Sequence, residues 1–292
     1  MTGVAADNPP IDGARAEDRK GVLALLEEDR IAEGVHRTVM RDFIENLIVE
    51  LVLGHRGKTR YRTPLVGFAR ADDPGFARLR EVASPRHMLP RDLLPTARAV
   101  VAFFIPFTAE LVEGNRRHPY VSREWAEAYI ETNRLIGSVC RALEEELKKK
   151  GVQAAWERPT HNFDTVALES FWSHKHVAYL CGLGKFGLHH MLITRAGCAG
   201  RLGSLVVDIP LSPTPIVAGE YCLYRRGENC TTCVRRCPTG ALTVEGLDRQ
   251  KCYRRLLEVN DRYQDLDLCD VCGKCATGPC ALGVPRGRGE GK

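Results

Sequence analysis

The stretch that decides the fold runs from Cys222 to Cys280 and holds nine of the 12 cysteines in the chain. Its centre reads Cys230-Thr-Thr-Cys233-Val-Arg-Arg-Cys237-Pro238, and the other members are Cys222, Cys252, Cys269, Cys272, Cys275 and Cys280. Thiolates are soft ligands that suit iron–sulfur clusters and zinc. No apolar signal-peptide core is found near Met1, so we expect a cytoplasmic protein whose clustered cysteines bind metal rather than form disulfides.

The spacing of these cysteines favours iron–sulfur clusters over zinc. The C-x2-C-x3-C-P run contains most of the bacterial ferredoxin signature, in which the last cysteine ligates the second of two clusters. Zinc sites show no preference for a proline after a cysteine, so two zinc ribbons remain the alternative metal site. We expect a short strand at Ala241–Val244, as in a ferredoxin half-repeat.

Eight of the nine cysteines are predicted to be ligands, in two sets of four. The simple ferredoxin pattern has a cysteine where this chain has Gly227, and Cys222 is the nearest substitute. The predicted first set is Cys222, Cys230, Cys233 and Cys280. The predicted second set is Cys237, Cys252, Cys272 and Cys275. An alternative second set takes Cys269 in place of Cys252; the spacing leaves both open, and we favour Cys252.

The bulk composition is that of a globular protein with one large domain, or a larger and a smaller one. The chain has 292 residues, of which 44% are hydrophobic and 27% charged. No apolar run reaches the length of a membrane-spanning helix, so we expect no membrane association. The net charge of +5 permits an anionic substrate or RNA and establishes neither.

The residues before the cysteines predict an α/β domain. Apolar spacing predicts helices at 16–33, at 38–53 and at 124–150. The second has a stripe of Val39, Phe43, Leu47 and Leu51, with Ile44 and Ile48 beside it. The continuous apolar run at 97–107 predicts a central strand buried on both faces. Further strands are expected at 152–156, where they complete a strand–helix–strand unit, and at 203–209. The predicted organisation is a disordered leader (1–15), an α/β domain (16–215), a metal domain (216–283) and a flexible tail (284–292).

A glycine-rich segment within that domain is a candidate ligand site. Gly182, Gly184 and Gly187 allow sharp bends and close approach of a ligand, and Lys185 lies among them. Their spacing matches the dinucleotide fingerprint only formally, because no clear strand precedes it and no acidic residue follows at the required distance. His176, beside Lys175, faces either a cofactor or the solvent.

Several segments resemble those of epoxyqueuosine reductases, a family related to the reductive dehalogenases. The resemblance rests on Pro90–Val101, Asp164-Thr165, Gly182-Leu183-Gly184-Lys185, Gly203-Ser204 and the split ferredoxin motif, which follow one another in the family's order over about residues 85–282.

This resemblance implies a nitroreductase-like cobalamin-binding α/β domain followed by a small bacterial ferredoxin-like domain with two [4Fe-4S] clusters. The clusters would reduce a bound cobalamin that acts on an electrophilic substrate. Asp164 matches the family's proton-donating aspartate. From the residues alone, a general acid needs a raised pKa, and an aspartate that caps a helix beginning at Thr165 is the other interpretation.

Two departures from the family weaken the expectation of a tRNA substrate. The chain inserts Phe171–His176 between the aspartate and the glycines, and it lacks the helical-repeat extension that tRNA-acting members often carry. The expected partner is an electron donor such as a flavodoxin or ferredoxin. The alternative function, in a different class, is a two-cluster electron-transfer protein without cobalamin that serves a partner enzyme.

Overall fold

The computed structural model describes residues 37–287 of the chain. The predicted leader at 1–15 and the predicted helix at 16–33 lie outside the described residues, as does most of the predicted tail at 284–292. Within the described part, no helix is long and apolar enough to cross a membrane.

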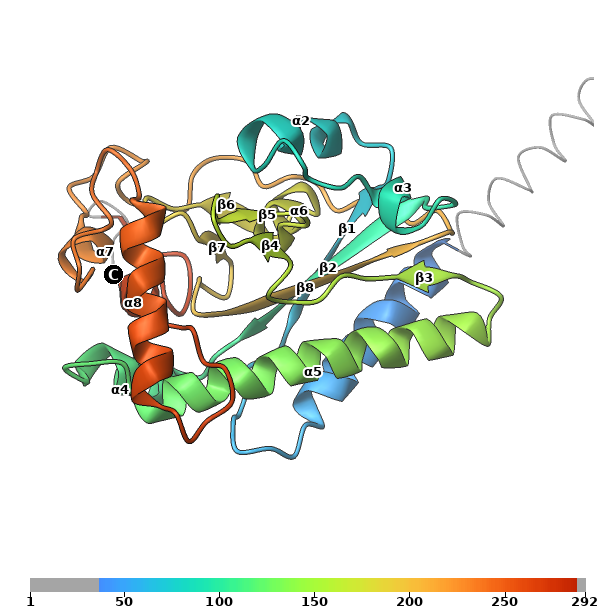
Figure 1. The fold of residues 1–292 in the computed structure, drawn as a ribbon. Helices are drawn as coiled ribbons and strands as arrows, with labels where there is room; N and C mark the ends of the chain where they lie inside the picture. Colours follow the sequence, from blue (N-terminus) through green and yellow to red (C-terminus); the bar gives the residue numbers. More distant parts are fainter. Residues whose placement is uncertain (1–36, 288–292) are drawn as a thin grey trace, which may run out of the picture.

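A four-stranded antiparallel sheet forms the centre of the molecule (Figure 1). Its strands, in spatial order, are β1 (Leu65–Arg70), β2 (Ala99–Pro106), β8 (Gly200–Val207) and β3 (Ala154–Ala155). All eight residues of β2 are buried, because helices cover both faces of the sheet, and this confirms the predicted central strand. β1 was not expected, since its sequence LVGFAR is short and contains a glycine.

Helices cover each face of the sheet. One face carries the helix whose described part is 37–53 and the long helix α5 (Arg123–Lys148). The other face carries α2 (Pro74–Val82), α3 (Pro90–Leu93) and α6 (His174–Leu180). α5 begins where the Ser122 side chain accepts a hydrogen bond from the Trp125 N–H, and it ends before Gly151, whose φ of +76° suits a glycine.

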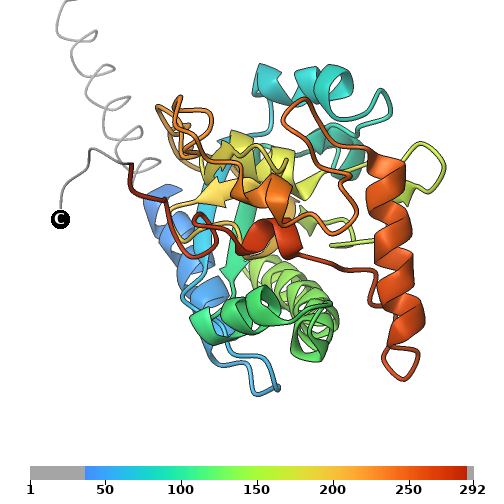
Figure 2. The same ribbon diagram turned by 90° about the vertical axis from the view of Figure 1, so that its left-hand side faces the viewer.

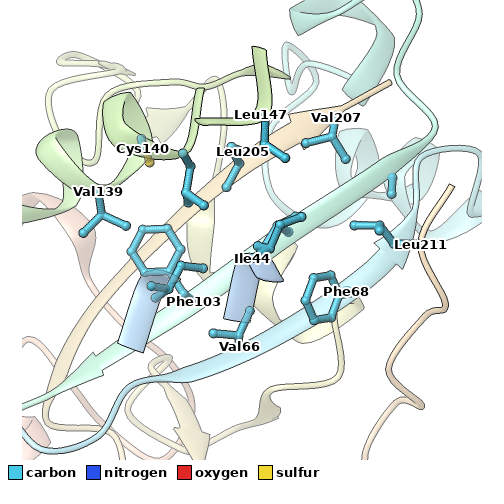
Figure 3. Packing of buried hydrophobic residues seen from close by; sticks show 14 of the residues in the cluster. Ile44, Val66, Phe68, Phe103, Val139, Cys140, Leu147, Leu205, Val207 and Leu211 are labelled. Atoms are coloured by element: carbon cyan, nitrogen blue, oxygen red, sulfur yellow. The ribbon is translucent and has the colours of Figure 1, made fainter. Parts of the chain in front are cut away.

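Figure 3 shows the core between the first pair of helices and the sheet. Ile44, Phe103 and Leu147 are fully buried there and come from three different elements. The helix at 37–53 is as predicted, but the row that the sequence analysis placed beside the stripe is the buried one, and Phe43, Leu47 and Leu51 are partly buried at its edge. Its buried positions are Met40, Ile44, Ile48 and Val52. Val39 is 60% exposed, because the helix turns its isoleucines toward the sheet.

The predicted strand–helix–strand unit is present with an interruption. The chain runs from β2 through α4 (Ala109–Arg117) and α5 to β3, but β8 lies between β2 and β3. β8 pairs antiparallel with both neighbours. Along the chain, two small hairpins follow β3 and precede β8. The first pairs β4 (Phe163–Asp164) with β5 (Glu169–Ser170), and the second pairs β6 (Gly184–Phe186) with β7 (Leu192–Thr194).

The cysteine-rich region packs across one end of the sheet (Figure 2). Its helices are α7 (Thr232–Arg235), α8 (Arg249–Arg262) and the 3-10 turn η1 (Lys274–Thr277). The predicted strand at 241–244 is absent, and only an isolated bridge joins Leu242 to Leu247. The chain turns back within five residues there, which leaves no room for a longer ladder.

Backbone contacts join the cysteine-rich region to the sheet. The N–H groups of Cys198 and Ala199 donate to Ala281 O at 3.1 and 3.0 Å. This close approach requires Gly197, because a Cβ there would lie 2.1 Å from the same oxygen and its φ is +92°. The α4 end contributes as well, since Asn115 Nδ2 donates to Cys272 O at 3.1 Å.

Candidate metal centre and adjoining cavities

Four of the predicted ligands converge on one small cavity. Cys222, Cys230, Cys233 and Cys280 all line it, together with His189. Burial, followed by the nearby thiols of Cys280, Cys222 and Cys230, raises the pKa of Cys233 to about 11. The charges of these thiols oppose one another, so ionisation of all four is favoured only where a cation neutralises them, and the set of sulfurs has the chemistry of a metal site.

The other four predicted ligands line a second, larger cavity of about 280 Å³. They are Cys237, Cys252, Cys272 and Cys275. Burial, and then the neighbouring Cys272 and Cys237, raise the pKa of Cys252 to about 11. Cys269 is fully buried elsewhere, against Ala126 and Tyr129. The geometry therefore groups Cys252 with the second set and leaves Cys269 apart from it.

The donor sets fit iron–sulfur clusters in number and kind. Each cavity is lined by four of the predicted cysteine ligands, and the larger one also by Cys198. All 12 cysteines of the chain are free thiols, and four thiolates are the usual ligand set of a [4Fe-4S] cluster. Lys274 fixes the loop that carries two of the second set, because its Nζ donates to Asn115 O and, at 2.6 Å, to His118 O.

A further cysteine, which the sequence analysis did not consider, lies beside the first set. Cys198 is buried, and its Sγ is 3.8 Å from Cys280 Sγ. His189 completes the group, with its Nε2 at 3.3 Å from Cys280 Sγ. The hydrogen bond from Cys198, and then the one from His189, hold the pKa of Cys280 at about 5. Cys198 lies outside the dense stretch, so only its position just before β8 could have drawn attention to it.

Three cavities meet at Lys175, next to the second thiol set. The cavity at that set, a second of about 330 Å³ and a third of about 350 Å³ all include Lys175 in their lining. The Lys175 Nζ donates to His190 O at 3.2 Å. His176 lines the third cavity, and its Nδ1 lies 2.7 Å from Ser173 Oγ. Burial, and then Lys175, lower the pKa of His176 to about 3, so its ring is neutral.

The glycine-rich segment does not line these cavities. Gly184 and Lys185 lie in β6 of the β6–β7 hairpin, where a Cβ at Gly184 would be 2.0 Å from Ile193 O. Gly182 ends α6 with a φ of +73° and packs on the linker at Pro215. Gly187 packs against Ile193. The structure thus accounts for the glycines by chain packing, while Lys185 Nζ lies 5.4 Å from the centre of the Tyr179 ring.

Asp164 caps a turn between β4 and β5 rather than a helix. Its Oδ1 accepts hydrogen bonds from the N–H groups of Val166 and Ala167, at 2.8 and 2.7 Å. Its Oδ2 is 2.5 Å from Arg86 Nη2. The Arg86 guanidinium, followed by those two N–H groups, lowers the pKa of Asp164 to about 2. In this conformation Asp164 is ionised and does not line the cavities at Lys175.

The fold is that of the epoxyqueuosine reductases, which confirms the mixed α/β class expected from the sequence. A solved structure of an epoxyqueuosine reductase with an epoxyqueuosine-modified tRNA-Tyr stem loop aligns with a TM-score of 0.55. The alignment covers 87% of this chain and 68% of that one, at 19% identity. The epoxyqueuosine reductase of Streptococcus thermophilus aligns with a TM-score of 0.53, over 85% of this chain and 68% of that one, at 16% identity.

Sequence similarity points to the same proteins. The epoxyqueuosine reductase of Staphylococcus aureus is 29% identical over 202 residues, which are 63% of this chain and 48% of that protein. The chain thus spans about half the length of the curated relatives it matches. No family model matches the chain. These findings confirm the resemblance to epoxyqueuosine reductases that the ordered motifs indicate.

Proposed function

We propose that this chain is an iron–sulfur oxidoreductase that delivers electrons to a bound corrinoid and thereby reduces an electrophilic substrate, as an epoxyqueuosine reductase-like enzyme. The observation that carries the proposal is the convergence of eight cysteines in two sets of four on adjoining cavities. The similarity to epoxyqueuosine reductases supports the same class of reaction.

The two thiol sets are the proposed ligands of two [4Fe-4S] clusters. The first cluster would be held by Cys222, Cys230, Cys233 and Cys280, and the second by Cys237, Cys252, Cys272 and Cys275. Cys275 is close enough to Cys233 of the other set for their charges to interact, which supports electron transfer between the clusters. An electron donor of the flavodoxin or ferredoxin kind, in the cytoplasm, would supply the electrons.

The proposed corrinoid site is formed by two of the cavities that meet at Lys175, the one at the second thiol set and the one lined by His176. They measure about 280 and 350 Å³, so a corrinoid needs the joint space of both rather than one of them. Lys175 and His176 are the polar residues placed to hold its edge. When bound, the corrinoid supplies a strongly reducing metal centre. Gly182, Gly184, Lys185 and Gly187 shape the hairpin behind Lys175 instead of touching the cofactor.

Asp164 remains the proposed proton donor, on the condition that its turn leaves Arg86. Held as it is, the carboxyl group has no proton to give at neutral pH. In a solved structure of the Bacillus subtilis epoxyqueuosine reductase, the loop that carries the catalytic aspartate is swung out of the active site. A comparable movement of residues 163–170 would carry Asp164 between the turn and the cavities.

The experiment that tests the proposal is analysis of iron, sulfide and cobalt in anaerobically purified protein reconstituted with excess cobalamin. Iron and sulfide in a ratio near one, at about eight of each per chain, together with bound corrinoid, support it. Zinc without iron contradicts it. Iron without corrinoid supports the alternative, a two-cluster electron-transfer protein, which the small size of the single cavities favours.

The substrate is tested separately. Epoxyqueuosine in tRNA is one candidate substrate, suggested by the similarity and weakened by the two departures from the family. Restoration of queuosine in a strain lacking its own epoxyqueuosine reductase would support it. Unchanged epoxyqueuosine, in a protein that holds both iron and corrinoid, would show that the substrate is another electrophile.

A further inference from the structure

Arg201 is a partly exposed cation whose Nε is enclosed by the protein. It stands near the start of β8, opposite Ile105, and its Nε has no hydrogen-bond partner among the described residues. Its guanidinium carbon lies 4.3 Å from the centre of the Tyr129 ring on α5. The nearby carboxylate of Asp270 is not within ion-pair distance, and it accepts a hydrogen bond from Tyr129 Oη at 2.6 Å. Arg201 therefore has donor capacity for a ligand.

The cavity in front of Arg201 has a positive character. This cavity of about 330 Å³ is lined by Arg201 and Lys175, and no aspartate or glutamate is among its described lining residues. His174, on the same wall, is neutral, because burial lowers its pKa to about 4. Its Nδ1 lies 2.8 Å from Ser204 Oγ and its Nε2 3.0 Å from Arg158 O. Two cations, Arg201 and Lys175, thus face a space whose described lining holds no carboxylate. His161 lines it as well, with its Nε2 3.8 Å from Asp270 Oδ1.

The size and chemistry of this cavity fit one group of ligands. A guanidinium binds a planar carboxylate or a phosphate with two parallel hydrogen bonds, and the pairing is strong where water is excluded. A space of about 330 Å³ takes a small molecule and not a macromolecule. Ser170 and Asn162 line the same cavity and supply neutral polar groups for the rest of a ligand.

We propose that the Arg201 cavity binds the oxyanion, carboxylate or phosphate, of a small organic substrate, with Lys175 as the second cation. The inference rests on the proposed function for the identification of the ligand as a substrate, because the same cavity adjoins Lys175 and the second thiol set. Binding of the anion itself requires only Arg201, Lys175 and the cavity between them.

Calorimetric titration of the full chain, purified anaerobically with its metal, tests this with two probes, sodium benzoate and inorganic phosphate. We expect at least one probe to bind, and where both bind we expect them to compete for one site. Arg201→Gln should weaken binding by roughly tenfold or more, because a charge-assisted bidentate contact is lost. Arg78→Gln is the control, since Arg78 is an exposed arginine on α2 away from the cavity, and it should leave binding unchanged.

Several results would overturn the proposal. One is failure of both probes to bind to the wild-type protein, and another is binding that Arg201→Gln does not weaken. If Arg201→Gln does not fold, two other measurements test the site. We then expect the probes to compete in the wild type and to bind Arg201→Lys more weakly. Iron and cobalt are measured on the same preparation. Anion binding by a preparation without iron would contradict the proposed function but would leave the anion site standing.

The corrinoid is a second source of oxyanion, and two corrinoids separate it from the substrate. Cobalamin carries a phosphodiester in its nucleotide loop, whereas cobinamide does not. If Arg201→Gln leaves the affinity for both corrinoids unchanged, the anion belongs to the substrate, as we propose. If the substitution weakens binding of cobalamin and not of cobinamide, Arg201 holds the cofactor's phosphate and the substrate assignment is wrong.

Discussion

His189 donates a hydrogen bond from Nε2 to the sulfur of Cys280, over 3.3 Å. The direction is fixed by the backbone, because His189 Nδ1 lies 3.1 Å from the Met191 nitrogen and accepts its N–H. The ring proton must therefore reside on Nε2. Hydrogen bonds to the sulfurs of an iron–sulfur cluster are among the features that set its reduction potential, so this contact would tune the proposed first cluster.

His189→Leu should lower the reduction potential of the first cluster by some tens of millivolts. The N–H dipole stabilises the negative charge that arrives on reduction, and leucine removes it. Redox titration followed by electron paramagnetic resonance measures the shift, with the second cluster in the same protein as the internal control. An equal shift of both clusters, or none, would contradict this role of His189.

Cys230→Ala should remove about half of the bound iron and lower the thermal stability, because the first set loses one of its four thiolates. Cys269→Ala is the matched control. Cys269 is buried away from both cavities, so its loss should cost only about 1 kcal/mol and leave the iron content unchanged. If Cys269→Ala loses as much iron as Cys252→Ala, the grouping of the second set is wrong.

Asp164→Asn should retain iron and corrinoid but lower turnover by roughly 100-fold or more, the usual effect of removing a general acid. Glu169→Gln is the control, because Glu169 stands opposite Asp164 in the same hairpin and receives a hydrogen bond from Ser84. Glutamine keeps that bond, so turnover should not change. Survival of turnover in Asp164→Asn would mean that another group donates the proton.

Arg86→Gln should raise the pKa of Asp164 toward its ordinary value of 3.8 and loosen the β4–β5 turn. The wild-type pKa lies below the ordinary value, so the ionised carboxylate stabilises the turn fully above about pH 4. That contribution is lost as the pH falls toward 2. Proteolysis within residues 163–170 should therefore be faster in Arg86→Gln at pH 7. The difference from the wild type, followed by hydrogen exchange, should shrink toward pH 2; a difference that grows there would contradict the ion pair.

Gly273→Ala should reduce the iron content of the second set and destabilise the protein by more than about 1 kcal/mol. The φ of Gly273 is +68°, and a Cβ there would lie 2.4 Å from the Trp125 ring. Gly246→Ala is the control, since its Cβ would meet nothing within 4 Å. Thermal unfolding and iron analysis measure both effects, and equal stability of the two variants would show that Trp125 does not constrain this loop.

Most of the correct predictions came from the cysteine pattern and from the longest apolar segments. β2 and α5 were predicted because continuous burial and a 3.6-residue period leave strong signals in the sequence. β1 and the two short hairpins were missed, because strands of two to six residues depend on partners that are remote in sequence. The stripe of the helix at 37–53 was misjudged, since two adjacent apolar rows gave no basis for choosing between them.

The candidate site, too, could be predicted from the sequence only in part. Spacing was enough to predict two sets of thiols, but the presence of Cys198 and Arg201 beside them depends on β8, whose start meets the cysteine-rich region only in three dimensions. The glycine-rich segment was predicted to contact a ligand because glycine permits close approach. In the structure, the close approaches at Gly182 and Gly184 are to the protein's own backbone.

The pairing of residues 198–199 with Ala281 has a consequence for maturation of the protein. Cys280 takes its place beside Cys198 only when the segment beyond η1 docks at the start of β8, so completion of the first set requires that docking. Iron delivered earlier would meet an incomplete set of donors. We therefore expect cluster insertion to follow folding of the α/β part, and we expect the cysteine-rich region, expressed by itself, to be a poor scaffold for its own metal.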